Sequence, residues 1–174
     1  IAEFNPPSTR NLTGRSLMID QGLKEMLLAH QQKFMIPASI VATVNETNSL
    51  NHAFLILTKN RYAKIVVVDN ENHYRGLISL AMITDRLIET AKINVAKLDQ
   101  YQVADVMQVD VLPITDPYDV EENLHLLIDQ SFLPVVDREN HFQGIVTRRE
   151  LLKAVNYAAH RFDHYYDVQS KLSK

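Results

Sequence analysis

Two apolar runs rich in β-branched residues, at positions 64–69 and 132–137, stand out in the hydrophobic pattern of this chain. Each run is followed by polar turn residues and then by a second apolar run, at 76–79 and at 144–147. Short apolar runs separated by turn residues are typical of β-hairpins. The pattern therefore predicts two hairpins.

Apolar residues at helical spacing, three or four positions apart, flank both predicted hairpins. They predict a helix before and a helix after each hairpin, and a short apolar strand leads each unit. Such spacing usually reflects core packing, and nearly all of these positions are assigned to the core. The expected leading strands are 40–44 and 111–114, and the expected helices are 50–59, 80–92, 120–130 and 148–166.

The two predicted units are copies of one pattern. A glycine follows seven positions after Asp69 and again after Asp137, and corresponding residues lie 68 positions apart. A unit of roughly 60 residues buries the face of its sheet poorly when alone. We therefore expect an α/β (α+β) fold in which two β-α-β-β-α units pack sheet to sheet with pseudo-twofold symmetry, and clefts between them as ligand sites.

Composition and periodicity predict how the whole chain is divided into segments. Residues 1–17 are rich in Pro, Asn, Ser, Thr and Gly without periodicity, so we expect a disordered or vector-derived segment, with Met18 as the natural start. Residues 18–33 are expected to form an N-terminal helix. The two repeats are expected at 34–98 and 99–157, and a C-terminal helical extension at 158–174.

Charge and residue usage limit the classes of function. The chain has 174 residues and carries 18 Lys and Arg against 21 Asp and Glu, and this near balance disfavours general binding to nucleic acid or to a membrane surface. It has no cysteine, which excludes disulfides, thiol catalysis and cysteine zinc sites. No apolar run approaches the ~18 residues of a membrane span. We expect a soluble cytoplasmic protein in which any anion site is local.

The segment 144–151 reads Gly-Ile-Val-Thr-Arg-Arg-Glu-Leu and places two arginines in the first turn of a predicted helix. Cations there are unfavourable by ~0.3–1 kcal/mol each, because the helix start carries partial positive charge. One explanation is a bound anion, held by helix amides and guanidinium groups. The other is that Arg148 and Arg149 lie in solvent or pair with Glu139 or Glu150, while Thr147 and Glu150 form a capping box.

The usual short catalytic motifs are absent from the sequence. It has only four glycines and contains no phosphate-binding glycine loop, dinucleotide fingerprint or His-Glu-x-x-His zinc motif. We therefore expect a binding protein rather than an enzyme, with no metal and no cofactor.

The duplicated pattern, with Val-Val-Asp, glycine seven residues later and Ser or Thr three after that, resembles a tandem CBS (cystathionine β-synthase) domain pair. The segment "VADVM" at 103–107 adds to this resemblance, which covers residues 34–157. Such pairs bind adenosine-containing ligands in the clefts between repeats and usually act as sensors. In that family a Gly-x-x-Thr-x-x-Asp segment binds ribose and phosphate.

The resemblance implies one competent site. The second repeat supplies Gly144, Thr147 and Glu150 for the family segment, with glutamate in place of aspartate. The first repeat supplies Gly76 and Ser79, but its acid position holds a methionine, Met82, which binds ribose hydroxyls poorly.

The opposite wall of that cleft is expected to come from the leading strand and the hairpin entrance of the first repeat. There the small side chains Ala42 and Ala63 leave room for a purine, and Tyr62 is placed to stack on it. The predicted ligand residues are Ile40, Val41, Ala42, Tyr62, Ala63, Lys64, Ile65, Thr147, Arg148, Arg149 and Glu150.

Within the CBS families, a chain with Thr-Arg-Arg after the second hairpin is similar to the stand-alone cyclic-di-AMP-binding proteins of Gram-positive bacteria. The segments at 34–44 and 98–107 also resemble that group. This implies a homodimeric receptor for cyclic di-AMP, which in its ligand-free form contacts effector enzymes such as the alarmone synthetase/hydrolase or pyruvate carboxylase. Ile40 departs from the basic residue expected there, and Lys64 is a candidate substitute.

Two other functions stay open at this point. One is a CBS module that senses AMP, ADP or ATP, and the other is a protein–protein adaptor whose clefts are vestigial. Met82 and Ile40 favour the adaptor.

Overall fold

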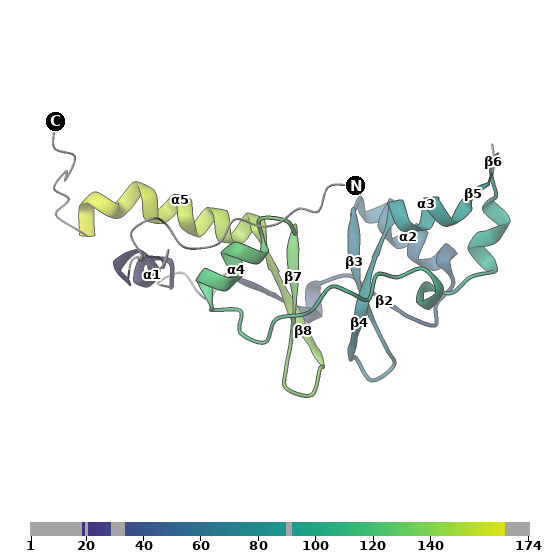
Figure 1. Cartoon of the computed structure of the whole chain (residues 1–174), viewed down its shortest axis with the longest axis horizontal. Coiled ribbons are helices and arrows are strands. Elements are labelled where there is room, and N and C mark those ends of the chain that lie inside the picture. The colour runs from purple at the N-terminus through teal and green to yellow at the C-terminus, as the bar shows by residue number, and fades with distance from the viewer. Residues whose placement is uncertain (1–18, 20, 29–33, 90–91, 166–174) are drawn as a thin grey trace, which may run out of the picture.

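Two antiparallel hairpins lie side by side at the centre of the computed structural model, which describes residues 19, 21–28, 34–89 and 92–165 (Figure 1). In the first repeat β3 (Lys64–Val68) pairs with β4 (Tyr74–Ser79), and in the second β7 (Phe132–Val136) pairs with β8 (Phe142–Thr147). Both predicted hairpins are confirmed. The prediction for residues 1–17 lies outside the described residues.

A third strand completes each sheet. β2 (Thr43–Asn45) pairs parallel to β3 of its own repeat, whereas β1 (Met35–Pro37) crosses over and pairs antiparallel with β8 of the second repeat. A single bridge between Gln108 and Leu77 makes the reverse crossing. Each sheet therefore receives a segment from the start of the other repeat, which agrees with the pseudo-twofold symmetry.

The crossing segments explain the glycines that recur in the two copies. A Cβ added to Gly76 would lie 2.3 Å from the carbonyl oxygen of Gln108, and one added to Gly144 would lie 2.2 Å from that of Ile36. Both glycines also have positive φ, 155° and 156°. Only glycine combines this backbone with so close an approach of another strand.

The leading strands are shorter than predicted. A 3₁₀ turn, η2 (Ala38–Ile40), occupies the start of the expected strand 40–44, and β2 begins only at Thr43. In the expected strand 111–114 only Ile114 bridges to Val135. Pro113 lacks a backbone N–H, so it interrupts strand pairing there.

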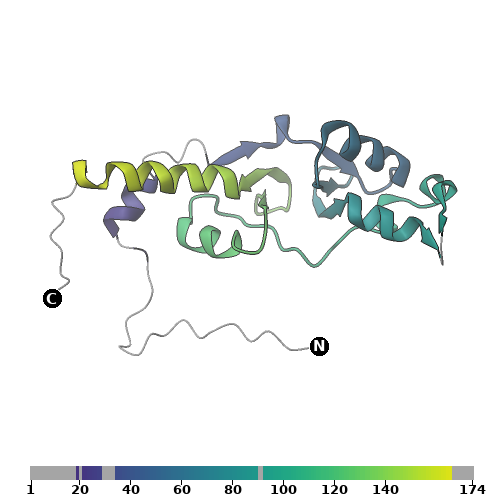
Figure 2. The same cartoon turned by 90° about the horizontal axis from the view of Figure 1, so that it is seen from above.

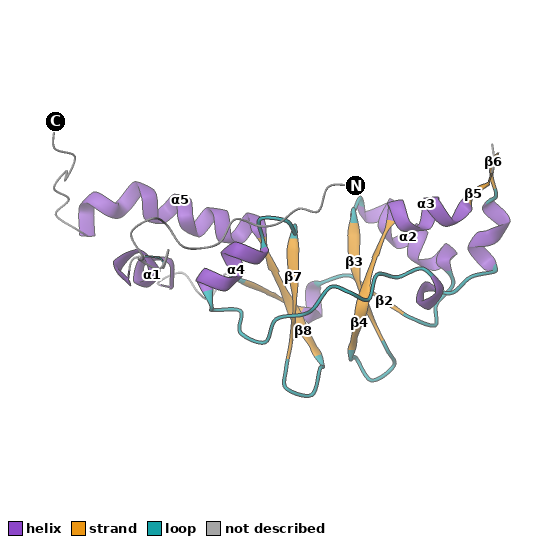
Figure 3. Cartoon of the chain, viewed as in Figure 1, coloured by secondary structure: helices purple, strands orange, loops and turns teal. Residues whose placement is uncertain are grey.

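Helices cover the outer faces of the two sheets (Figure 3). Two of them end earlier than predicted. After α3 the chain forms a two-stranded ribbon instead of another helical turn, because the Asn94 N–H binds the carbonyl of Leu87 and its side chain binds Glu89. The elements are α1 (Gln21–Leu28), α2 (Leu50–Asn60), α3 (Leu80–Leu87), β5 (Ile88–Glu89), β6 (Lys92–Ile93), η3 (Val95–Asp99), η4 (Val103–Asp105), α4 (Val120–Leu126) and α5 (Arg148–Tyr165).

Buried side chains form one cluster within each repeat and a third between them. The third cluster contains Val66, Leu77, Val136 and Phe142, which come from the facing sides of the two sheets. The α/β (α+β) fold with two repeats packed sheet to sheet is therefore confirmed. Seen from above, α5 extends beyond the second sheet together with α1 (Figure 2). Within the described ranges no helix is long and apolar enough to cross a membrane.

The turns of the two hairpins also bind each other. The rings of His73 and His141 stack with centroids 4.6 Å apart. Each imidazole Nδ1 lies close to the carboxylate that directly follows the first strand of its hairpin, 3.0 Å from Asp69 and 3.2 Å from Asp137. Backbone bonds join the turns in both directions, from Tyr74 to Asn140 and from Phe142 to Asn72.

These two carboxylates have lowered pKa values. For Asp69, desolvation opposes the change, but hydrogen bonds from His73 and from the Glu71 amide outweigh it and lower the pKa. For Asp137, the hydrogen bond from the backbone of His141 is the largest cause of the lowered pKa. The turns therefore favour ionised aspartates where the repeats meet.

Candidate functional site

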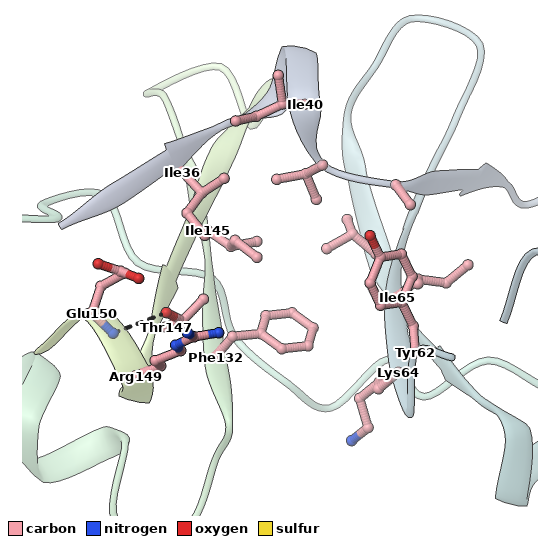
Figure 4. A pocket seen from close by; sticks show the side chains of 13 residues that line it. Ile36, Ile40, Tyr62, Lys64, Ile65, Phe132, Ile145, Thr147, Arg149 and Glu150 are labelled. Atoms are coloured by element: carbon pink, nitrogen blue, oxygen red, sulfur yellow. Dashed lines mark hydrogen bonds between the residues drawn. The ribbon is translucent and has the colours of Figure 1, made fainter. Parts of the chain in front are cut away.

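A pocket of about 360 Å³ lies between the two repeats (Figure 4). One wall comes from η2, the two residues that follow it, Tyr62 and β3, and the other from β1, β7, β8 and the first turn of α5. The volume falls within the ~300–1,000 Å³ typical of small-molecule sites. The pocket brings together nine of the eleven predicted residues: Ile40, Val41, Ala42, Tyr62, Lys64, Ile65, Thr147, Arg149 and Glu150.

Most of the pocket surface is aliphatic or aromatic, and four of the residues that form it were not predicted. Ile36 and Ile145 are register partners in the β1–β8 pair, so they enter the pocket through the strand crossing. Val66 continues the β3 wall, and Phe132 projects between the two sides in Figure 4. Phe132 is the register partner of Thr147 in the β7–β8 hairpin, so the register of the predicted hairpin was the signal that could have revealed it.

The polar end of the pocket is the start of α5, where Thr147, Arg149 and Glu150 lie together (Figure 4). The Thr147 hydroxyl oxygen accepts a hydrogen bond from the Glu150 amide at 3.2 Å and so caps the helix. The Glu150 carboxylate binds Lys153 Nζ at 2.7 Å. The capping explanation therefore holds for Thr147. The hydroxyl proton of Thr147 and the remaining carboxylate lone pairs of Glu150 are still available to a ligand.

Arg149 is exposed at this end of the pocket. No hydrogen bond or ion pair joins its guanidinium to another residue in the described part of the chain. Neither the Glu139 nor the Glu150 partner expected from the sequence is realised, because Glu139 lies 3.7 Å from His141 and Glu150 binds Lys153. Arg149 is thus a cation at a helix start with no compensating side chain in the described structure.

Arg148 does not enter this pocket. Its Nε donates to the carbonyl of Leu127 at 2.7 Å, and its Nη2 donates to the carbonyls of Ile128 and Gln130 at 3.1 and 2.8 Å. These carbonyls follow the C-terminal end of α4, where partial negative charge favours a cation. The contact between Arg148 and phosphate therefore stays a prediction that the pocket does not support, because the protein's own backbone occupies this guanidinium.

Two further predicted ligand residues, Ala63 and Lys64, are bonded to other parts of the protein. Ala63 is not among the residues that line the pocket, and its carbonyl accepts a hydrogen bond from the Leu80 amide. Lys64 lines the pocket, but its Nζ donates to the side-chain oxygen of Gln108 at 3.1 Å. Lys64 would have to leave Gln108 before it could take the place of a basic residue at Ile40, which is 73% exposed at the rim.

The equivalent position in the first repeat has no comparable chemistry. Ser79 caps α3 by accepting from the Met82 amide at 3.2 Å, and its side chain is buried. Leu80 and Ala81 occupy the places of the two arginines, and Met82 occupies that of Glu150. The prediction of a single competent site rests on this difference. Across the described residues, no three His, Asp or Glu side chains form a group that could hold a metal ion.

The comparisons with known proteins agree with this architecture. The family model described as "CBS domain" matches residues 34–89 and 103–157. The chain is 38% identical over 141 residues to the cyclic di-AMP receptor B of Bacillus subtilis, covering 80% of this chain and 95% of the receptor.

Solved structures give the same result. The crystal structure of Listeria monocytogenes CbpB protein in complex with c-di-AMP matches with a TM-score of 0.68 at 46% identity, over 76% of this chain and 96% of that one. The structure of CbpB from Streptococcus agalactiae matches with a TM-score of 0.79 at 28% identity, over 90% of this chain and 99% of that one.

Proposed function

The chain belongs to the CBS-domain family, and on that premise we propose that it is a regulatory receptor, not an enzyme, that binds cyclic di-AMP in the pocket between its repeats. The main support is Arg149, an uncompensated guanidinium at the polar end of an otherwise apolar pocket. An apolar cleft with a few convergent polar groups is typical of a ligand site. A phosphodiester supplies the negative charge that this helix start lacks.

The pocket suggests a place for each part of the ligand. One adenine lies against the apolar side, between Ala42, Tyr62 and Phe132, where aromatic rings offer stacking surface. The ribose lies at Thr147 and Glu150, which have a donor and an acceptor available. The phosphate lies at Arg149, where a guanidinium group forms charge-assisted hydrogen bonds.

The volume of the pocket bears on how much of the ligand it encloses. About 360 Å³ is at the low end of the range for small-molecule sites. Cyclic di-AMP has two adenosine halves, so we propose that one half occupies the pocket and the other extends past the exposed rim at Ile40.

Calorimetric titration tests this proposal. Cyclic di-AMP, AMP, ADP and ATP are each titrated into the protein, and we expect the strongest binding with cyclic di-AMP. Arg149→Ala should weaken that binding by about 1.5–3 kcal/mol, the contribution of a charged hydrogen bond. Arg138→Ala, at the exposed turn of the same repeat, is the matched control and should bind normally.

The outcomes separate the candidate functions. No heat with any nucleotide at ~100 μM, a concentration at which even a micromolar ligand nearly saturates, would refute a nucleotide receptor and favour the adaptor. Binding of AMP or ATP alone would indicate an energy-sensing module. The open pocket disfavours the adaptor for this cleft, because a vestigial cleft would be filled by side chains.

We propose further that the protein is a homodimer and that its ligand-free form contacts an effector enzyme such as the alarmone synthetase/hydrolase or pyruvate carboxylase. The support is the resemblance to the stand-alone cyclic-di-AMP-binding group. A ligand regulates such a contact only if it binds one of two states more tightly. Light scattering on a sizing column measures the dimer, and titration of each purified enzyme with and without cyclic di-AMP measures the contact.

A further inference from the structure

Glu150 is the one acidic side chain among the described residues that line the pocket between the repeats. Its side chain is 20% exposed, and one carboxylate oxygen accepts a hydrogen bond from Lys153 Nζ at 2.7 Å. Lys153 is 58% exposed, stands three residues further along α5 and does not line the pocket. A carboxylate of the pocket is therefore held by an ammonium group that reaches it from outside.

Two other cations, Arg148 and Arg149, stand in the first turn of α5 beside Glu150. Arg148 donates to three backbone carbonyls, so its guanidinium is not available to the carboxylate. Arg149 lines the same pocket as Glu150, yet no bond joins these two side chains in the described structure, and they diverge from the helix start in Figure 4. Adjacent residues on a helix do not face each other, but both of these side chains turn into one pocket. Arg149 is therefore the cation that the Glu150 carboxylate would meet in the pocket without Lys153.

The length of the glutamate side chain makes this hold important. Thr147 binds the Glu150 amide and leaves the carboxylate free to move about three rotatable bonds. The bond to Lys153 fixes that carboxylate at its far end. An ion pair with so exposed a lysine contributes little to the stability of the fold, because water screens it. Its main effect is then on where the carboxylate points.

We propose that Lys153 is a positioning residue for the ligand, because its pairing with Glu150 keeps that carboxylate apart from Arg149. This role rests on the proposed function, in which Arg149 binds a phosphate and Glu150 accepts from the ribose. An ion pair between Arg149 and Glu150 would use the guanidinium that attracts the phosphate and the oxygens that accept from the ribose hydroxyl. With a cation of its own, the carboxylate leaves Arg149 to the ligand.

Calorimetric titration of the full-length chain tests this role with two probes, cyclic di-AMP and its 2′-deoxyribose analogue. Lys153→Met removes the ammonium group and keeps an aliphatic stem. It should weaken cyclic di-AMP roughly threefold to tenfold and reduce the preference for the ribose form over the deoxyribose form. The ratio between variant and unmodified protein should approach one as salt is added, because salt screens the mispaired ions.

Two control variants accompany this titration. Lys153→Arg keeps a cation within reach of Glu150, so it should bind both probes as the unmodified protein does. Lys59→Met removes an exposed lysine from α2, far along the chain from the pocket's polar end, and should also leave binding unchanged. Urea unfolding followed by circular dichroism should give nearly the same midpoint for Lys153→Met as for the unmodified protein.

A double variant separates mispairing from a simple loss of positive charge. Glu150→Gln leaves no carboxylate to pair with Arg149, so adding Lys153→Met to it should change the affinity for cyclic di-AMP little. If loss of charge alone were responsible, Lys153→Met would weaken cyclic di-AMP equally with glutamate or glutamine at position 150.

Several results would overturn the positioning role. Unchanged affinity and unchanged ribose preference in Lys153→Met would refute it and leave the proposed function intact, and so would an equal loss of affinity in the Glu150→Gln background. A urea midpoint that falls in step with the affinity would assign Lys153 to the stability of α5 instead. If the unmodified protein fails to bind cyclic di-AMP, the proposed function is refuted and the positioning role falls with it.

Discussion

Replacing Arg148 with alanine should cost stability, whereas replacing its neighbour Arg149 should cost ligand affinity. The part-buried bond from Arg148 to Leu127 is a charged hydrogen bond, and such bonds contribute about 1.5–3 kcal/mol. The two exposed bonds, to Ile128 and Gln130, contribute roughly 0.5 kcal/mol each after screening by solvent. Removing a cation from the start of α5 regains ~0.3–1 kcal/mol.

The net loss for Arg148→Ala is therefore about 1.5–3.7 kcal/mol in the free energy of unfolding. For a chain of this size that corresponds to a fall in Tm on the order of 3–15 °C. Arg149→Ala removes an unfavourable cation and no described bond, so its free energy of unfolding should stay equal or rise slightly. Its affinity for cyclic di-AMP should fall roughly tenfold to a hundredfold.

Urea unfolding followed by circular dichroism, together with calorimetry below the unfolding transition, measures both quantities for each variant. Arg148→Lys is an informative companion, because a single ammonium group cannot reproduce a fork that binds three carbonyls. Arg138→Ala serves as the control for loss of a surface arginine. If Arg148→Ala leaves the urea midpoint unchanged and lowers affinity as much as Arg149→Ala does, the assignment of the two arginines is refuted.

Three further predictions concern the fold around the site. Gly144→Ala should lower the free energy of unfolding by at least ~2 kcal/mol, because the new methyl group would lie 2.2 Å from the carbonyl oxygen of Ile36. Urea unfolding measures this loss, and an unchanged urea midpoint would contradict the crossing of β1. Thr147→Val should cost ~1 kcal/mol of unfolding free energy through the lost cap, and it should also weaken cyclic di-AMP in calorimetry. The pKa values of Asp69 and Asp137 are lowered in the folded protein, so the stability they contribute is present above the unfolded-state pKa near ~4 and is lost as the pH falls through the folded-state pKa. Urea midpoints measured from pH ~6 down to pH ~3 should fall less in the double aspartate-to-asparagine variant, and an equal fall would contradict this role.

The hairpins and helices were predictable because residues close together in the sequence specify them. Strand pairing within each hairpin is short in range, so the β-branched runs and turn residues of positions 64–79 and 132–147 are sufficient to specify it. The cap at Thr147 follows from a residue type with a strong preference for the helix start. The 68-residue repeat then implied two packed sheets, since neither sheet buries its face alone.

Contacts between distant parts of the chain were not predictable in the same way. β1 begins the first repeat yet pairs with the last strand of the second, which brings Ile36 and Ile145 into the pocket. No local pattern encodes that choice, because three apolar residues pair equally well with several strand edges. The ribbon after α3 likewise depends on Asn94, which binds the end of the helix from outside it.

Arg148 and Arg149 show most clearly the difference between what the sequence determines and what the tertiary structure decides. The sequence by itself determined that two cations stand at the start of a helix beside a ligand motif, and that this requires compensation. Successive residues on a helix point about 100° apart, because each turn takes roughly 3.6 residues. Only the packing of α5 on its sheet sets its rotation, and that rotation turns Arg148 toward the end of α4 and Arg149 toward the pocket.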